Sequence, residues 1–332
     1  MQTVLVTGAT GCVGSNLAIA LFRTGRRVRI LRRSTSSLDV LDDTPCQEFT
    51  GDVCDEALLR SAMDGCDVVY HAAAIVTFAR GARDEQQRVN VLGTRAVVNA
   101  CLSAGVGTLV HVSSVAAIGY PEPGSMADEE TPVDRRAARG YKLTKILAED
   151  EILRGVGRGL RAVIVNPSVV IGERDTRFHA GQLIRDIKKG RIPFYVDGGM
   201  NIVYVGDVVR GMIKAGETGK SGERYVLCGE NMTHREIFFR VAALIGGRRP
   251  LAKLPLRLLR AAGRLIETGS RLVGAAPLFT ADLAAIAGRY NWYSSAKAER
   301  ELGFTKTPFD QTILAAYRWY VSHGMLKQGG LD

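Results

Sequence analysis

The apolar residues in the first half of the chain form short runs that alternate with helical patterns. Between the runs, apolar residues recur three and four positions apart, which is the spacing of an amphipathic helix. A run of three or four mostly apolar residues suits a strand that is buried on both faces. The alternation therefore predicts an α/β fold, namely a Rossmann doubly wound parallel sheet. The predicted strands are residues 4–6, 28–31, 68–70, 109–112 and 162–165.

The first apolar run leads directly into a glycine-rich turn, and a helical pattern follows. In a dinucleotide-binding unit, the first glycine permits a tight turn, the second lets the backbone approach a pyrophosphate, and the third lets the helix pack on the strand. No Lys-Ser/Thr pair follows the glycines, so an ATPase-type phosphate loop is disfavoured. The predicted cofactor contacts in this turn are Gly8, Thr10, Gly11, Cys12, Val13 and Gly14.

The end of the second predicted strand indicates which dinucleotide binds. A carboxylate usually stands there in NAD-binding folds, where it accepts a hydrogen bond from the ribose 2′-hydroxyl. This chain has Arg32 and Arg33 instead, and guanidinium groups suit a 2′-phosphate. We therefore predict NADP(H). Asp52, followed by Val53, stands where a carboxylate could reach the adenine amino group; its alternative role is to cap the helix that starts near Glu56.

The alternation of strands and helices ends near residue 172. Pro193 and the glycine pairs at 198–199 and 246–247 interrupt the second half. We expect residues 1–170 to form the NADP-binding Rossmann domain, with a returning segment near 200–220, and residues 171–332 to form mainly a smaller substrate-binding lobe. Thr233 followed by Glu236 predicts a capping box that opens a helix in this lobe.

Three residues carry the predicted chemistry. Tyr141 and Lys145 are four positions apart, so on a helix they share one face. An ammonium near a phenol favours the phenolate, so the spacing predicts a lowered pKa for the tyrosine. Such a tyrosine can exchange a proton with a carbonyl oxygen as hydride is transferred. Ser114, at the end of a predicted strand, would orient that oxygen.

These motifs resemble the extended short-chain dehydrogenase/reductase family over nearly the whole chain. The chain looks most similar to the dihydroflavonol-reductase-like group, and within it to the bacterial hopanoid-associated sugar epimerase branch. The resemblance implies that Ser114, Tyr141 and Lys145 are the catalytic triad and that Asn90 supports them or relays water. It also implies cofactor contacts at Ala72, Ala73, Ala74, Asn90, Val112, Tyr141, Lys145, Asn166, Pro167 and Ser168.

One position departs from the pattern of the nucleotide-sugar members of the family. Those members carry an arginine for the pyrophosphate of the sugar nucleotide where this chain has Met200. A thioether cannot bind a diphosphate, so Arg174 or Arg177 would have to replace the lost charge. We therefore expect an NADP(H)-dependent oxidoreductase that interconverts a carbonyl and an alcohol on a small, rather apolar substrate. An NADP-dependent nucleotide-sugar epimerase or dehydratase is the alternative, and a non-catalytic NADP sensor is a third class.

Composition agrees with a compact enzyme. The chain has 332 residues, of which 46% are hydrophobic, enough for a large core. Its six cysteines form no Cys-x-x-Cys pair and its five histidines have no metal-ligand spacing, so neither a metal site nor a disulfide framework is expected. The N-terminus is itself the first predicted strand, so we expect no targeting peptide and a cytoplasmic location.

The net charge of +10 is concentrated in the second half of the chain. Without a recognition motif, this charge does not indicate nucleic-acid binding. Residues 257–273 pattern as a helix with arginines on one face and apolar residues on the other. That helix either covers the substrate lobe or makes a peripheral contact with the inner membrane surface. A homodimer is also left open.

Overall fold

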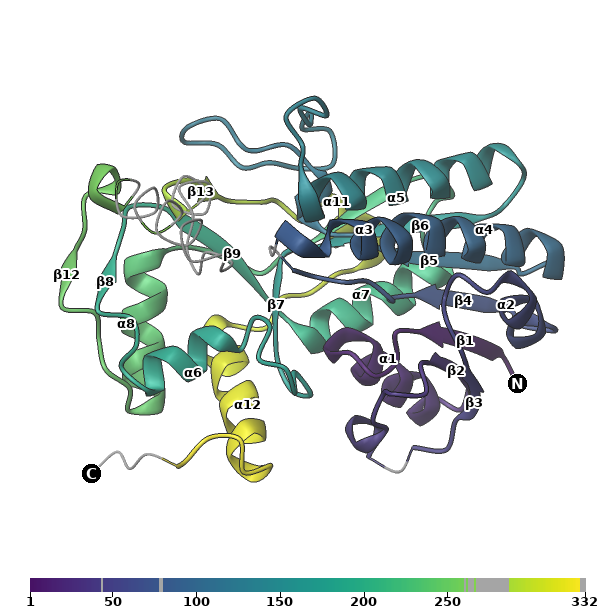
Figure 1. Ribbon diagram of the computed structural model, residues 1–332, viewed down its shortest axis with the longest axis horizontal. Coiled ribbons are helices and arrows are strands. Elements are labelled where there is room, and N and C mark those ends of the chain that lie inside the picture. The colour runs from purple at the N-terminus through teal and green to yellow at the C-terminus, as the bar shows by residue number, and fades with distance from the viewer. Residues whose placement is uncertain (43, 78–79, 260, 262–265, 267–286, 329–332) are drawn as a thin grey trace.

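The computed structural model describes residues 1–42, 44–77, 80–259, 261, 266 and 287–328 (Figure 1). A parallel sheet of seven strands forms its centre, in the order β10-β6-β5-β4-β1-β2-β3. This arrangement confirms the predicted Rossmann fold. The strands are β1 (Thr3–Thr7), β2 (Arg27–Arg32), β3 (Gln47–Thr50), β4 (Val68–His71), β5 (Thr108–Val112), β6 (Ala162–Pro167) and β10 (Arg224–Leu227).

Helices cover both faces of this sheet, as a parallel sheet requires. On one face, α1 (Cys12–Arg23) packs beside α7 (Val205–Thr218). On the other, α4 (Gly93–Ala104) lies between α2 (Glu56–Met63) and α5 (Gly140–Gly157). Each face has its own apolar core, built from fully buried side chains such as Leu17 and Met212 on the α1 side and Leu59 and Val97 on the α4 side.

The second half builds a lobe around a smaller sheet, in which β9 pairs with β7, β11 and β13 (Figure 1). Its core lies between this sheet and three helices, with Ile184, Ile237 and Ile313 fully buried. The elements are β7 (Val169–Ile171), α6 (Gln182–Lys188), β8 (Phe194–Tyr195), β9 (Gly199–Tyr204), β11 (Glu230–Thr233), α8 (His234–Ile245), β12 (Ala252–Lys253), β13 (Tyr290–Asn291) and α12 (Phe309–Ser322). Between β13 and α12, α11 (Ala296–Leu302) packs on α7 and β10 of the first domain.

Short helices complete the connections: η1 (Asp39–Leu41), η2 (Arg80–Ala82), α3 (Arg83–Gln86), η3 (Gln87–Leu92) and η4 (Val115–Ala117). Of these, η3 is a π-helix that runs directly into α4. Single turns of π-helix are often found at functional sites. Here the turn carries Asn90.

The chain returns from the lobe to the nucleotide-binding sheet through α7 and β10. The segment expected near 200–220 therefore begins later, since β9 belongs to the lobe, and extends to residue 227. Asp207 in α7 is fully buried and accepts hydrogen bonds from the backbone N and Oγ1 of Thr307, at 2.6 and 2.8 Å. This carboxylate ties the returning helix to the last part of the chain.

Two predictions about the lobe have different outcomes. The capping box is confirmed: the Thr233 side chain accepts from Glu236 N, and the Glu236 carboxylate accepts from Thr233 N. The amphipathic helix predicted at 257–273 lies almost wholly outside the described residues. Among the described residues, no helix is long and apolar enough to cross a membrane.

Candidate active site

The glycine turn between β1 and α1 is packed so tightly that two of its glycines have no room for a side chain. Gly8 has φ +72°, and a Cβ there would lie 2.6 Å from the backbone N of Ala73. A Cβ on Gly14 would lie 2.1 Å from the Gly8 carbonyl oxygen. The turn therefore brings β1, α1 and the residues after β4 into backbone contact.

The N-terminus of α1 is free to receive an anion. Its N-cap residue is Gly11, which offers no side-chain hydrogen bond, and no acidic residue stands in the first turn. The first N–H groups of a helix lack intrahelical partners and carry the positive end of its dipole. Cys12 and Val13 are the first residues of this helix, and the Cys12 thiol donates to the Glu173 carbonyl oxygen at 3.4 Å. These groups fit the diphosphate of a dinucleotide.

The two arginines at the end of β2 have different surroundings. Arg32 Nε lies 2.7 Å from the Glu48 carboxylate on β3, and its side chain is largely covered. Arg33 is exposed and makes no ion pair with any described residue. The pattern of the sequence did not reveal Glu48 as a partner, because it depends on how β2 and β3 align. Arg33 is therefore the guanidinium most available to a phosphate.

Asp52 is also engaged by a residue that sequence reasoning missed. Arg88 from η3 donates to both carboxylate oxygens of Asp52, at 3.0 and 3.1 Å, and to Glu85. These hydrogen bonds hold the pKa of Asp52 below its usual value. Asp52 does not cap α2, since the cap is Asp55, which accepts from Leu58 N at 3.0 Å. To accept a hydrogen bond from an adenine amino group, the Asp52 carboxylate would have to do so while it also accepts from Arg88.

Beneath the glycine turn, a chain of buried polar groups runs towards α5. Thr7 Oγ1 lies 2.8 Å from His71 Nδ1, and His71 Nε2 lies 3.0 Å from Thr94 Oγ1. Burial lowers the pKa of His71 to about 3, so the ring is neutral. Thr94 then donates to the Asn90 carbonyl oxygen at 2.7 Å. The backbone shelf of residues 72–74, next to β4, is fixed between these groups.

Asn90 connects the shelf to α5. Its Oδ1 accepts from Ile75 N at 2.7 Å, and its Nδ2 donates to the Ile75 carbonyl oxygen and to Thr144 Oγ1, both at 3.1 Å. Thr144 in turn donates to the carbonyl oxygen of Tyr141. The predicted supporting residue therefore reaches the catalytic helix through one hydroxyl.

Ser114, Tyr141 and Lys145 come together where β5 ends beside the start of α5. A hydrogen bond joins the side chains of Ser114 and Tyr141. Lys145 Nζ lies 5.9 Å from the centroid of the Tyr141 ring and donates to the Val112 carbonyl oxygen at 2.9 Å. Since Lys145 is only 3% exposed, its charge acts in surroundings where water screens little.

The pKa of the tyrosine does not follow the prediction from spacing. Burial raises the pKa of Tyr141 to about 12, and its hydrogen bond with Ser114 opposes this only in part. Burial also lowers the pKa of Lys145 to about 8, while the charge of Glu149 raises it. The expected lowering of the tyrosine pKa by the lysine is therefore wrong for this structure, because desolvation is the larger effect.

Glu149 forms a second, buried layer behind the triad. One of its oxygens, Oε1, accepts from Ser113 Oγ at 2.5 Å and from Asn166 Nδ2 at 2.7 Å. Asn166 also donates to the Ser114 carbonyl oxygen at 3.0 Å. The carboxylate of α5 is thus tied to the ends of β5 and β6. The four-residue spacing from Lys145 to Glu149 was the signal in the sequence that could have found it.

The residues after β6 reach into the lobe. Ser168 Oγ donates to Asn201 Oδ1 at 2.7 Å, next to Pro167 at the end of β6. Beside Asn201, Met200 is half-buried and packs against the apolar core of the lobe. Arg174 donates to the Val40 carbonyl oxygen and to Asn16, and it pairs with Asp42. It therefore joins the lobe to the first domain and has few donors left for a diphosphate; Arg177 remains exposed.

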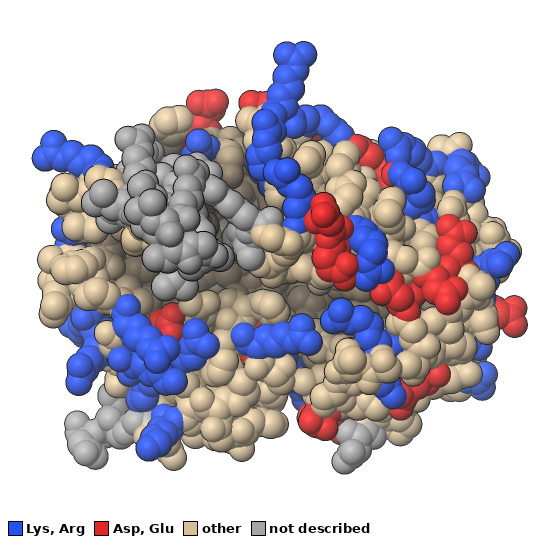
Figure 2. Space-filling view, viewed as in Figure 1, with Lys and Arg blue, Asp and Glu red and all other residues tan. Residues whose placement is uncertain are grey.

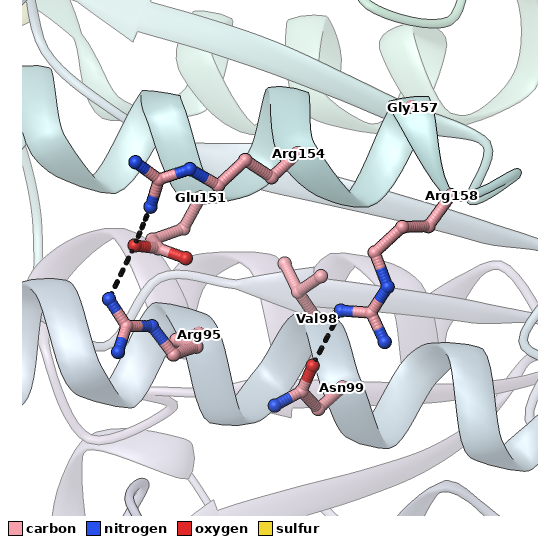
Figure 3. A pocket seen from close by; sticks show the side chains of 7 residues that line it. All are labelled: Arg95, Val98, Asn99, Glu151, Arg154, Gly157 and Arg158. Carbon is pink, nitrogen blue, oxygen red and sulfur yellow. Dashed lines mark hydrogen bonds and ion pairs between the residues drawn. The ribbon is translucent and has the colours of Figure 1, made fainter.

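A separate surface pocket of about 520 Å³ lies between α4 and α5 (Figure 3). Figure 3 shows Arg95 and Arg154 on either side of Glu151, at 2.8 and 2.5 Å, and Arg158 bonded to Asn99. The residues that line this pocket include none of the predicted site residues. Its arginines are held by groups of the same two helices.

Comparison with known proteins agrees with this geometry. Residues 4–228 match the model of the NAD dependent epimerase/dehydratase family. The chain is 33% identical to sterol demethylase protein B of Methylococcus capsulatus, over 98% of this chain and 100% of the relative. It is 35% identical to a 4-hydroxy-2-methyl-3-oxo-4-farnesyl-3,4-dihydroquinoline-1-oxide ketoreductase of Stigmatella aurantiaca, over 94% and 95%. A crystal structure of a nucleoside-diphosphate-sugar epimerase from Pseudomonas aeruginosa superposes with a TM-score of 0.82 at 27% identity, covering 98% and 99%.

The fold and the relatives of the chain are those of an NAD(P)-dependent oxidoreductase. The chain belongs to the NAD dependent epimerase/dehydratase family, within the extended short-chain dehydrogenases/reductases. The predicted family is thereby confirmed, whereas the hopanoid-associated branch stays a prediction. When bound, the nicotinamide cofactor of this family supplies or accepts a hydride.

Proposed function

We propose that the protein is an NADPH-dependent reductase that converts a ketone or aldehyde on a small apolar molecule into an alcohol. The observation that carries this proposal is the hydrogen-bonded pair of Ser114 and Tyr141, with Lys145 one helical turn further along. Two hydroxyls that share one hydrogen bond can both turn towards a carbonyl oxygen. The geometry fits general acid catalysis at that oxygen.

Each residue of the triad has a distinct role in the proposed step. Tyr141 gives its phenolic proton to the carbonyl oxygen while a hydride adds to the carbonyl carbon, so the C=O double bond becomes C–OH. Ser114 donates a hydrogen bond that orients and polarises the same oxygen. The Lys145 ammonium stabilises the phenolate that remains and would contact the nicotinamide ribose. In the reverse direction, the phenolate takes the proton of the alcohol.

The cofactor would lie along the carboxyl ends of the strands. The backbone of the glycine turn and the start of α1 would hold the diphosphate, because no side chain blocks them. We infer a preference for NADPH, since Arg33 is exposed and lacks an ion pair with any described residue. Arg32 would bind the 2′-phosphate only to the extent that its ion pair with Glu48 opens.

An apolar substrate is favoured over a nucleotide sugar by Met200. Its thioether packs against the core of the lobe, and Arg174 is engaged by other residues. The ketoreductase relative also acts on a molecule that carries a farnesyl chain, according to its name. The alternative, a nucleotide-sugar epimerase, draws support from the name of the family and from the epimerase structure.

One assay separates these two functions. Loss of NADPH absorbance is followed with apolar ketones, with sterol-like ketones and with UDP- and GDP-sugars. A reductase consumes NADPH stoichiometrically, whereas an epimerase regenerates its cofactor and gives no net change. We expect oxidation with an uncharged ketone and no tight binding of nucleotide sugars by calorimetry. Micromolar binding of a nucleotide sugar without net NADPH oxidation would favour the epimerase.

A homodimer and a peripheral contact with the inner membrane surface also stay proposals. Residues 257–273, predicted to make that contact, are mostly not described.

A further inference from the structure

The outer edge of the lobe exposes several large apolar side chains. Leu251 is 83% exposed, Leu258 53% and Phe194 49%. Single exposed apolar residues are normal on a protein surface, but a group of them indicates a contact surface. Phe194 and Leu251 lie at β8 and next to β12, and Leu258 follows in the helical segment after β12; we call this part of the lobe surface the β8–β12 edge.

Backbone contacts hold this edge together. Phe194 on β8 pairs in register with Ala252 on β12. Leu251 N donates to the Pro193 carbonyl oxygen at 2.8 Å, so Leu251, which directly precedes β12, lies next to the start of β8. On the inner side, the half-buried Tyr195 ring meets Phe239 edge-on at 6.2 Å. The edge is therefore a fixed surface of the lobe, with Tyr195 turned inward.

The same part of the chain, and the turn after α6, carries exposed positive charge. The exposed cations are Lys189, Arg191, Arg248, Arg249, Lys253 and Arg257. The two turns that carry most of them touch, because Arg248 N donates to the Ile187 carbonyl oxygen. Figure 2 shows Lys and Arg side chains gathered over the end of the lobe where α6 and α8 lie in Figure 1.

Few carboxylates neutralise this charge. Asp197 pairs with Lys253 at 2.7 Å, and Asp186 lies 3.1 Å from Arg185 and 3.8 Å from Arg191. Lys189, Arg248, Arg249 and Arg257 form no ion pair with any described residue. The edge thus combines exposed apolar side chains with four cations that pair with no carboxylate of the described residues.

We propose that the β8–β12 edge docks on the surface of an anionic lipid bilayer. Such a surface offers negative headgroups directly above an apolar layer, which matches cations that flank Phe194, Leu251 and Leu258. A nucleic acid would satisfy the cations but has no apolar layer for these side chains. A second copy, related by a twofold axis, would bring the same cations against each other. The inference rests on the proposed function in one respect: docking on the bilayer would serve to collect an apolar substrate.

Sedimentation of the full chain with vesicles tests this proposal. At low salt, we expect the protein to sediment with phosphatidylcholine vesicles that contain phosphatidylglycerol, and added salt should release it. It should not sediment with vesicles of pure phosphatidylcholine. Arg248→Gln combined with Arg249→Gln should weaken binding about tenfold or more, since each cation near an anionic surface contributes appreciably. Phe194→Ser combined with Leu251→Ser should weaken it to a similar degree.

Matched controls remove the same groups from the surface of the first domain. Arg23→Gln with Arg60→Gln takes away two exposed charges, and Phe22→Ser with Leu153→Ser takes away two exposed apolar side chains. Both control proteins should bind vesicles like the unaltered protein. The proposal would be overturned if the edge variants bound vesicles as well as the unaltered protein does. It would also be overturned if the unaltered protein stayed in the supernatant with anionic vesicles at low salt.

Two further measurements separate this proposal from others. Sedimentation equilibrium that reveals a dimer dissociated by the edge substitutions would assign the edge to a second copy instead. NADPH oxidation with a water-soluble ketone should be unchanged in the edge variants. If the unaltered protein binds vesicles but oxidises no NADPH with any ketone, the reductase fails while the membrane proposal stands.

Discussion

Glu149 Oε1 accepts a hydrogen bond from Asn166 Nδ2 at 2.7 Å, directly behind Ser114 and Lys145. Asn166 donates in turn to the Ser114 carbonyl oxygen, so the carboxylate of α5 positions the strand end that carries the serine. Its negative charge also raises the pKa of Lys145, against the larger effect of burial. Glu149 therefore influences both the position of Ser114 and the charge of Lys145.

Replacing Glu149 with Gln should change the pH dependence of the reaction. The amide can still accept from Ser113 and Asn166, but the negative charge that raises the pKa of Lys145 is gone. Lys145, whose pKa is about 8, loses its positive charge as pH rises, so activity falls on the basic side. In the variant this fall should move to lower pH, with kcat/KM at pH 8 reduced roughly three- to tenfold.

Glu151→Gln is the matched control on the same helix. Glu151 is almost as buried but pairs with Arg95 and Arg154 at the surface. Its pH profile should coincide with that of the unaltered protein. A basic limb in Glu149→Gln that stays in place or moves to higher pH would contradict the role given to Glu149.

Tyr141→Phe should abolish turnover while NADPH affinity stays nearly unchanged. The ring remains and only the proton donor is lost, and a general acid contributes about 10²- to 10⁴-fold to a rate. Lys145→Ala should impair both turnover and cofactor binding. Stopped-flow turnover and fluorescence titration with NADPH measure the two effects. A phenylalanine variant that keeps most of its activity would show that the acid lies elsewhere.

The preference for NADPH should depend more on Arg33 than on Arg32. NADPH should bind at least about tenfold more tightly than NADH, because a charge-assisted hydrogen bond contributes roughly 1.5–3 kcal/mol. Arg33→Ala should remove most of this preference, whereas Arg32→Ala should have a smaller effect, since Arg32 is paired with Glu48. Replacing both should largely erase it.

Glu48→Gln provides the complementary test. It frees Arg32 from its ion pair, so NADPH should bind more tightly and NADH should not. Titration of each variant with both cofactors gives these values. Equal affinity of the unaltered protein for NADPH and NADH would refute the assignment of Arg33.

Gly14→Ala should destabilise the protein strongly. A Cβ there would lie 2.1 Å from the Gly8 carbonyl oxygen, so the backbone of the turn must shift, at a cost of about 1–3 kcal/mol or more. Gly157→Ala is the control, because that glycine ends α5 and a Cβ would meet nothing within 4 Å. The control should be neutral or more stable by up to about 1 kcal/mol. Denaturant unfolding measures both, and an unchanged midpoint for Gly14→Ala would argue against the close approach.

Much of the first domain could be predicted from the sequence because its elements have local signatures. The five predicted strands lie within β1, β2, β4, β5 and β6. Strand β10 was missed. Its pattern is only four residues long, Arg224–Leu227, and it follows the first elements of the lobe, far along the chain from the other strands of the sheet. The lobe was foreseen only as an interruption of the alternating pattern.

Side-chain partners were the harder part of the site. Arg32 meets Glu48 because β2 and β3 pair in one particular register, and Arg88 meets Asp52 across a turn of π-helix. Neither pairing has a sequence signature. The spacing of Tyr141 and Lys145 located both residues, yet it gave the wrong direction for the tyrosine pKa, because burial depends on the whole fold.

The position of β10 in the central sheet has a consequence for synthesis of the chain. Residues up to Pro167 can pair as six strands, but the seventh is made only after β7, α6, β8, β9 and α7 have emerged from the ribosome. Until then, the edge of β6 has an open row of backbone donors and acceptors, which can pair with other chains. The nascent protein is therefore most prone to aggregate while residues 168–227 are being translated, and chaperone capture should peak in that interval.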